Sequence, residues 1–309
     1  MVRMCFDADL LMKYVQRTTR LAHAKNSVWR PQLPPHVPVE FSELCQSHGA
    51  NGVSVSTIPD AARVTESDIT SVLVSLPPAL SEITLIRRIP RSTELLLTID
   101  HFVQAEHIVA HDLGLRTNQP VVILIQGDKP GPGIRPGQDA LLMAQGVSQL
   151  PGIRIVGVAA SVTENQNYRS VVKAIEHTQQ QFRESDIGCD FVSVAVTSDA
   201  VPADNTVVTE IRDPTLLEMP NKDQPLVWLE AEVISRPSLE FAVLNVSQSL
   251  PETQETIWLP DFPEAQVSHR SDGCCLVTAT GNAGQLKIGD VVRVMSSVLT
   301  RRPAMWSDQ

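Results

Sequence analysis

The sequence predicts an α/β protein in which a (β/α)8 barrel is followed by an all-β domain. Over residues 2–195, short apolar runs alternate with helix-like stretches, and this alternation favours parallel βαβ units. Eight such runs occur, which is the number of strands that closes a barrel of this kind. After about residue 203, strand-like runs follow one another without helices. We therefore predict a barrel over residues 1–202 and a β domain over residues 203–309.

The predicted barrel strands are the short apolar runs of the first two thirds of the chain. They cover residues 2–6, 20–24, 51–55, 70–75, 93–97, 121–125, 153–158 and 190–194. An open doubly wound sheet would show the same alternation, but its usual glycine-rich turn, G-x-G-x-x-G, does not follow the first strand. The barrel is therefore the preferred architecture.

Three of the intervening stretches carry clear helix signals. Residues 100–113 begin with Asp100 as an N-cap and end before a glycine. Residues 136–149 begin with Pro136, which suits the first turn of a helix. Residues 165–185 form a polar, glutamine-rich amphipathic pattern, so we expect a helix there too.

The predicted β domain contains strand-like runs separated by turn signals. The runs cover residues 226–234, 240–245, 255–259, 265–268, 274–280 and 290–295. Turns are predicted at residues 282–284 and 287–290, where glycine occurs with asparagine or aspartate.

Charge and composition exclude two classes of partner. The 309-residue chain has 25 Lys plus Arg against 35 Asp plus Glu, so its formal charge is −10. Because no dense run of basic residues occurs, we expect no nucleic-acid partner. The first residues carry Arg3, Asp7, Asp9 and Lys13 and lack the apolar core of a signal peptide or a membrane span. We therefore expect no membrane partner.

Cysteine usage indicates a reducing compartment. The chain has 5 cysteines, an odd number, and no C-x-x-C motif. Cys274 and Cys275 are adjacent and can hardly pair with each other without strain. The sequence therefore predicts neither a disulfide framework nor a zinc site, and it favours a cytoplasmic protein.

A lysine ends the second predicted barrel strand, in the sequence His23-Ala24-Lys25. Catalytic groups of (β/α)8 barrels lie at the carboxyl ends of the strands, so Lys25 is a candidate for catalysis. A lysine at a strand end can equally extend its charged head into solvent. Position alone leaves both interpretations open.

Seven segments, in order along the chain, carry a family resemblance. They are Phe6–Leu10, His23–Lys25, Gly52–Ala62, Val121–Ala140, Pro151–Val158, Val233–Leu244 and Leu286–Asp290. Together they resemble the fold-type III pyridoxal phosphate (PLP) enzymes, in particular the D-threonine aldolase and D-serine dehydratase branch. The resemblance implies an alanine-racemase-like barrel followed by a D-serine-dehydratase-like β domain.

The resemblance also implies roles for individual residues. Lys25 corresponds to the lysine that forms the Schiff base with PLP, and His23 would help to position the ring. Ser193, Thr197 and Ser198 lie in the stretch that corresponds to the family's phosphate loop. The hydroxyls of Thr197 and Ser198 could bind a phosphate or, equally, cap the following turn. The implied activity is that of a PLP-dependent lyase or related enzyme acting on a small amino acid, and the implied assembly is a homodimer.

Several positions depart from the family pattern. The phosphate-loop stretch, Val192–Ser198, has valines in place of glycines, and branched Cβ atoms disfavour the positive φ angles of such loops. The position of a family arginine falls near Gly131, with Lys129 close by. Val298 and Thr300 stand at about the metal-ligand positions and cannot bind a divalent ion, so we expect no metal.

Two hypotheses follow from the match and its departures. The first is a PLP-dependent lyase-like enzyme that uses Lys25 without a metal ion. The alternative is a catalytically inactive member of the family, which binds PLP, another small anion or a protein partner.

Overall fold

The computed structural model describes residues 3–34, 37–112, 118–213, 226–246, 257–269 and 274–296. The chain forms two compact units. One unit combines Met1–Leu11 with Leu217–Gln309, and the other comprises Met12–Leu216.

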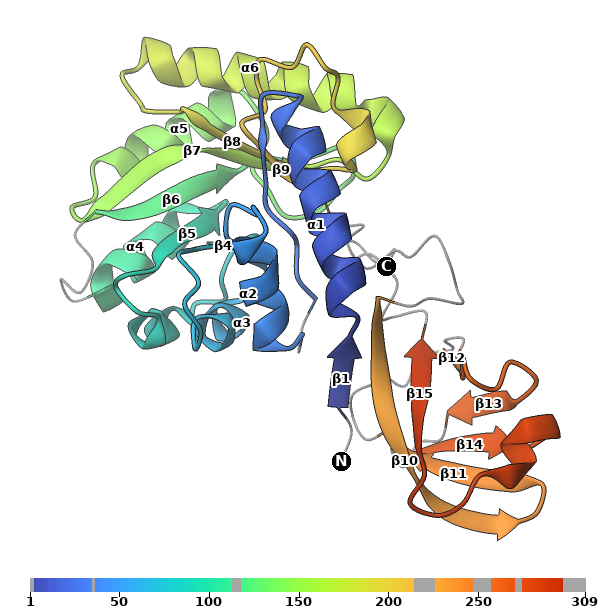
Figure 1. Ribbon diagram of the computed structural model, residues 1–309. Coiled ribbons are helices and arrows are strands. Elements are labelled where there is room, and N and C mark those ends of the chain that lie inside the picture. The colour runs from blue at the N-terminus through green and yellow to red at the C-terminus, as the bar shows by residue number, and fades with distance from the viewer. Residues whose placement is uncertain are drawn as a thin grey trace. The chain divides into compact units, whose positions relative to one another are not determined.

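The larger unit is a barrel of eight parallel strands (Figure 1). The strands are β2 (Val28–Trp29), β3 (Val53–Val55), β4 (Ser71–Val74), β5 (Glu94–Ile99), β6 (Gln119–Leu124), β7 (Ile153–Ser161), β8 (Phe191–Ala195) and β9 (Glu210–Arg212). Their order is β2-β9-β8-β7-β6-β5-β4-β3. A parallel bridge between Gln32 and Ser54 joins the chain after β2 to β3 and closes the sheet. The predicted barrel is therefore confirmed.

Two of the eight predicted strands are wrong, although the total is right. Residues 2–6 contain a strand, β1 (Arg3–Phe6), but it pairs antiparallel with β10 of the smaller unit. Residues 20–24 belong to the end of helix α1 (Ala8–His23) and the turn after it. The strands that complete the barrel instead are β2 and β9, which pair with each other. β9 lies beyond residue 202, the predicted end of the barrel.

Helices cover the outside of the barrel sheet, as Figure 1 shows for α4, α5 and α6. The helices are α2 (Val39–Ser47), α3 (Ile58–Val64), α4 (Phe102–Asp112), α5 (Gln138–Ser148) and α6 (Tyr168–Glu184), with short 3-10 segments at Ile83–Arg88, Asn165–Asn167 and Ser198–Ala200. α4, α5 and α6 confirm the three predicted helices. α6 is amphipathic because Val171, Ile175 and Phe182 recur at helical spacing on its buried face. No helix of the described ranges has the length and apolar character needed to cross a membrane.

The smaller unit is an antiparallel sheet. Its strands are β10 (Val227–Ser238), β11 (Phe241–Asn245), β12 (Ile257–Trp258), β13 (Gln266–His269), β14 (Cys274–Thr278) and β15 (Val291–Ser296), with a 3-10 turn at Gly281–Gln285. They lie in the order β12-β15-β10-β11-β14-β13, and β1 pairs with β10. Alternate residues of β10, Leu229, Ala231 and Val233, are buried in one apolar cluster. The predicted all-β domain is confirmed.

Candidate functional site

Lys25 lies in the turn that ends α1 and precedes β2, so the prediction that it ends a barrel strand is wrong. The N–H groups of Asn26 and Ser27 bond to the carbonyls of His23 and Ala22, and Asn26 has a φ of 53°. These bonds and the left-handed residue are a common way to end a helix, and they place Lys25 at the C-cap. The apolar residues that suggested a strand are therefore the last turn of an amphipathic helix.

The structure brings Lys25 to one predicted cofactor-binding residue, Ser198. Lys25 Nζ donates a hydrogen bond to the main-chain carbonyl of Ser198, and its side chain is half-buried. His23, in the last turn of α1, is exposed to solvent. Lys25 and Ser198 thus lie together, while His23 forms no part of this contact.

The polar groups of Ser198 converge on a carboxylate that the sequence did not single out. Its main-chain N–H and its hydroxyl both donate to Oδ2 of Asp213, at 2.9 Å and 2.7 Å. Ser198 and Asp213 are 5% and 3% exposed. Thr197, the preceding residue, donates through its hydroxyl to Asn165 Oδ1 at 3.0 Å. The hydroxyls of Thr197 and Ser198 are therefore both engaged within the chain.

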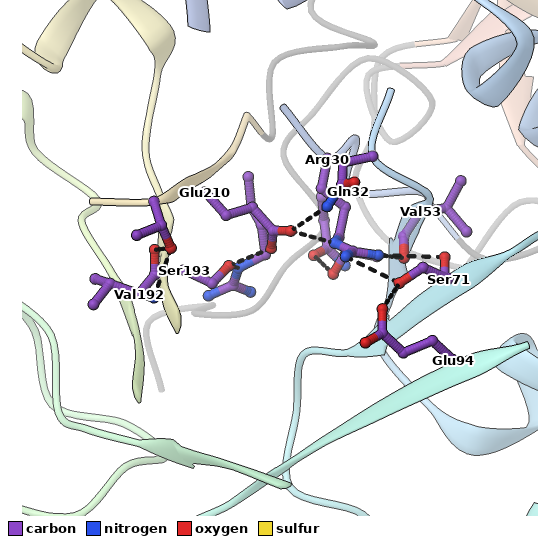
Figure 2. A network of polar contacts seen from close by, with 12 residues as sticks. Arg30, Gln32, Val53, Ser71, Glu94, Val192, Ser193 and Glu210 are labelled. Atoms are coloured by element: carbon purple, nitrogen blue, oxygen red, sulfur yellow. Dashed lines mark hydrogen bonds and ion pairs between the residues drawn. The ribbon is translucent and has the colours of Figure 1, made fainter. Parts of the chain in front are cut away.

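Ser193 belongs to a buried polar network inside the barrel (Figure 2). Its hydroxyl donates to Oε1 of Glu210 at 2.7 Å, and Oε2 of Glu210 accepts from Nε of Arg30 at 2.7 Å. Glu210 also accepts from Nδ2 of Asn51 at 3.4 Å. Arg30 and Glu210 form an ion pair whose side chains are 1% and 0% exposed. Ser193 is therefore part of the barrel interior, where its hydroxyl joins two strands.

Arg30 has an acceptor at each of its three nitrogens. Besides Glu210, it donates through Nη1 to the carbonyls of Val53 and Ser71 and through Nη2 to the hydroxyl of Ser71. Gly52 makes this reach possible, because a Cβ atom there would lie 2.8 Å from Nη1 of Arg30 and 2.1 Å from the Ser71 carbonyl oxygen. The guanidinium thus links β2 to the amino ends of β3 and β4.

Arg212, at the end of β9, is a second fully buried guanidinium, with 0% exposure. Its Nε donates to the hydroxyl of Ser193 at 2.9 Å and its Nη2 to the carbonyl of Ala160 at 3.0 Å. Within the described part of the chain, its Nη1 has no hydrogen-bond partner. Burial lowers the pKa of Arg212 to about 10, opposed by the charge of Glu210 and aided by that of Arg30.

Lys129 is the one lysine in the described ranges that follows the carboxyl end of a barrel strand, here β6. It pairs with Glu164 at 3.5 Å, and its side chain is 44% exposed. The adjacent Asp128 accepts bonds from the N–H groups of Thr163 and Glu164. Partial burial raises the pKa of Asp128, but these bonds outweigh it and hold the pKa below its ordinary value. A cavity of about 420 Å³ lies between this loop and the first turns of α6.

No cluster of three or more metal-ligating side chains occurs in the residues that the structure describes. The two positions that correspond to the family's metal ligands, Val298 and Thr300, lie outside the described residues.

Sequence reasoning missed Arg30, Glu210, Arg212 and Asp213, which carry most of the polar contacts. One signal was present in the sequence Glu-Ile-Arg at 210–212. In a strand, alternate residues point to the same face, so Glu210 and Arg212 share a face. Charged residues inside an apolar strand pattern indicate a buried polar site.

A parallel eight-stranded barrel followed by an antiparallel β domain is the fold of the alanine-racemase-type barrel class. Residues 35–212 match the model of the family "Alanine racemase, N-terminal domain". The match covers more than half of the chain, so the chain belongs to this family, which is part of the fold-type III PLP class. The matched range begins after Lys25.

Solved structures share the fold over most of the chain at low identity. D-threonine aldolase from Filomicrobium marinum has a TM-score of 0.76 and 19% identity, over 94% of this chain and 85% of that chain. D-threo-3-hydroxyaspartate dehydratase from Delftia sp. HT23 has a TM-score of 0.71 and 17% identity, over 98% and 92%. Alanine racemase from Clostridium difficile 630 has a TM-score of 0.72 and 12% identity, over 94% and 85%. No curated protein matches the sequence significantly.

Proposed function

We propose that this chain is a non-catalytic member of its family that binds a small anionic ligand inside the barrel. The observation that carries the proposal is Arg212, a guanidinium with 0% exposure and one N–H-bearing nitrogen, Nη1, that lacks an acceptor in the described residues. A buried donor without an acceptor is destabilising by about 1–3 kcal/mol, and more when the donor is charged. A ligand that supplies an acceptor would remove this penalty.

The chemistry of Arg212 favours an oxyanion. Guanidinium groups bind carboxylates and phosphates through short, charge-assisted hydrogen bonds. Nε and Nη2 of Arg212 are held by Ser193 and Ala160, so the side chain is fixed in orientation before any ligand arrives. With a pKa of about 10, the group stays charged at neutral pH. A small carboxylate or phosphate therefore suits the site.

The described residues do not fit PLP held through a Schiff base at a strand end. Such a site needs a lysine amine beside the ring and clustered N–H groups for the phosphate. Lys25 precedes β2, and Lys129 is paired with Glu164. The N–H and hydroxyl of Ser198 are both engaged by Asp213. These contacts support binding without PLP chemistry.

A second candidate is a PLP-dependent lyase acting on a small amino acid through Lys25. Two observations favour it: membership of a PLP family, and the contact of Lys25 with Ser198 in the stretch that resembles the phosphate loop. The two functions differ in whether a lysine of this chain binds PLP covalently.

An absorbance spectrum with PLP, before and after borohydride reduction, separates the two candidates. We expect no reducible aldimine band that depends on Lys25, so the wild type and Lys25→Ala should give the same spectrum. Lys129→Ala is the matched control for labelling of an exposed lysine. A reducible band present in the wild type and lost only in Lys25→Ala would overturn the proposal in favour of the lyase.

Thermal unfolding in the presence of anions tests the ligand. Phosphate and malonate, each compared with chloride at equal ionic strength, should raise the Tm of the wild type and not that of Arg212→Met. Arg293→Ala, which removes an exposed arginine paired with Asp261, should respond like the wild type. If the anions shift the Tm of all three proteins equally, or of none, the effect does not depend on Arg212 and the binding proposal fails.

A further inference from the structure

We infer that the chain supplies its own anion at the position that the family resemblance gives to the cofactor phosphate, and that this anion is the carboxylate of Asp213. The inference stands on contacts at Ser198 and does not depend on a ligand at Arg212. It explains why a barrel of this class would exclude a phosphate-bearing cofactor.

The strand arrangement brings the two residues together. β8 and β9 pair in parallel with Ala195 opposite Arg212, so the residues that follow both strands emerge side by side. Ser198 follows β8 and Asp213 follows β9 directly. The pairing extends past the strand end, because the N–H of Val196 donates to the carbonyl of Arg212. Asp213 is thus placed at the end of β9, within reach of Ser198.

The contact has the form of an oxyanion site. Two donors of one residue, the N–H and the hydroxyl of Ser198, point at a single oxygen, Oδ2 of Asp213, at 2.9 Å and 2.7 Å. Hydrogen bonds from such groups to a buried anion are the strong, charge-assisted kind. Lys25 adds a positive charge nearby, since its Nζ bonds to the carbonyl of Ser198. Donors that would suit a phosphate oxygen are therefore satisfied by a carboxylate.

A phosphate could not share this position with Asp213. Two anions at hydrogen-bond distance from the same donors repel each other, and burial of both residues leaves little water to screen them. The loop offers no replacement donors at Val196, because its N–H belongs to the strand pairing. The exclusion therefore depends on the Asp213 charge, and removing that charge should open the position.

The test is phosphate binding measured after Asp213 is replaced. All proteins carry Arg212→Met, so any anion bound at Arg212 is removed and the result is independent of the proposed function. In this background we expect Asp213→Gly to gain inorganic phosphate binding, with a dissociation constant at least tenfold lower than that of the parent. Binding is followed as a rise in Tm with phosphate, against chloride at equal ionic strength.

Asp128→Gly in the same background is the matched control. Asp128 also accepts main-chain N–H groups, those of Thr163 and Glu164, but it lies in an open loop. Its loss should lower the Tm without phosphate rescue. If Asp213→Gly does not fold, Asp213→Asn retains the side-chain shape and should show the same gain to a smaller extent. If neither folds, refolding yield in phosphate is compared with that in chloride.

Two results would overturn the inference. One is a parent protein that binds phosphate as tightly as its Asp213 variants. The other is the absence of any phosphate-dependent gain in Tm or refolding yield in those variants. Either would reduce Asp213 to a structural cap of the Ser198 turn.

Discussion

Two sides of one barrel each bury an arginine, and the two arginines differ in their hydrogen-bond partners. On the β2–β4 side, Arg30 has an acceptor at every nitrogen and an ion pair with Glu210. On the β7–β9 side, the acceptors of Arg212 among the described residues are neutral, and its Nη1 has none there. Both side chains are essentially without solvent exposure.

This difference distinguishes Arg30, whose charge stabilises the fold, from Arg212, whose charge is available to bind a ligand. Burying a guanidinium is unfavourable unless a counter-charge and hydrogen bonds offset the lost hydration. Arg30 meets that condition within the folded chain, so its role is to stabilise the fold. Arg212 meets it only in part, and burial lowers its pKa, a kind of perturbation that clusters at functional sites.

Replacing each arginine by methionine, which keeps most of the volume, should give the largest contrast. Arg30→Met leaves Glu210 buried without its partner, and we expect it to lower the free energy of unfolding by about 3–5 kcal/mol. Arg212→Met removes an incompletely bonded charge and should change it by no more than about 1 kcal/mol without ligand. Urea unfolding of both variants measures the two values.

The control for this pair is Arg30→Lys, which retains the charge and should recover part of the loss. Similar losses in Arg30→Met and Arg212→Met would contradict the distinction between the two arginines, because Arg212 would then be as structural as Arg30.

Gly52→Ala should give a smaller but still substantial loss, because it disturbs the β2–β4 side alone. Gly52 has a φ of +73°, and an added Cβ would lie 2.1 Å from the Ser71 carbonyl oxygen. We expect a loss of about 2–3 kcal/mol from strain and displacement of Arg30. Gly152→Ala is the matched control, with a φ of +77° and no atom within 4 Å of the added Cβ.

Gly152→Ala should lose only about 1 kcal/mol, the strain of the left-handed conformation itself. Equal losses at the two glycines, measured by urea unfolding, would show that the space around Arg30 is not tight.

The fold could be predicted from the sequence because the spacing of apolar residues indicates which segments are helices and which are strands. The buried residues of β4 and β10 follow strand patterns, and α6 follows a helical one. The ends of elements within an apolar stretch are harder to predict, because a helix end and a short strand have similar sequences over five residues. At residues 20–24 the deciding signal was Asn26, whose left-handed conformation ends α1 before β2 begins.

The candidate site was harder to predict, because its key contacts join strands far apart in sequence. Ser198 was singled out, but its partner Asp213 is placed by the pairing of β8 with β9. Likewise, Glu210 bonds to Arg30 only because β2 and β9 are neighbours in the closed sheet. The sequence alone could show that charged residues such as Glu210 are unusual in a strand. It could not identify their partners, because the partners are set by the order of the strands in the sheet.

Ser193→Ala should have a smaller effect than Arg30→Met or Gly52→Ala, and it tests whether the Arg30 ion pair and Arg212 are energetically coupled. The hydroxyl of Ser193 donates to Glu210 and accepts from Arg212, so it is the link between the Arg30 ion pair and Arg212. Its loss leaves one acceptor and one donor without this partner, and we expect a decrease of about 1–2 kcal/mol. In an Arg212→Met background only Glu210 loses a bond, so the decrease should be smaller.

The difference between the two backgrounds is the coupling energy of a double-mutant cycle, which for groups in contact is about 0.5 kcal/mol or more. A measurable coupling means that Glu210 helps to hold Arg212 in place through Ser193. The Arg30–Glu210 ion pair would then help to orient the proposed anion site at Arg212. Additive effects would mean that Arg212 is positioned by Ala160 and packing alone. Arg30 and Arg212 would then belong to independent sites, and anion binding at Arg212 should persist in Ser193→Ala.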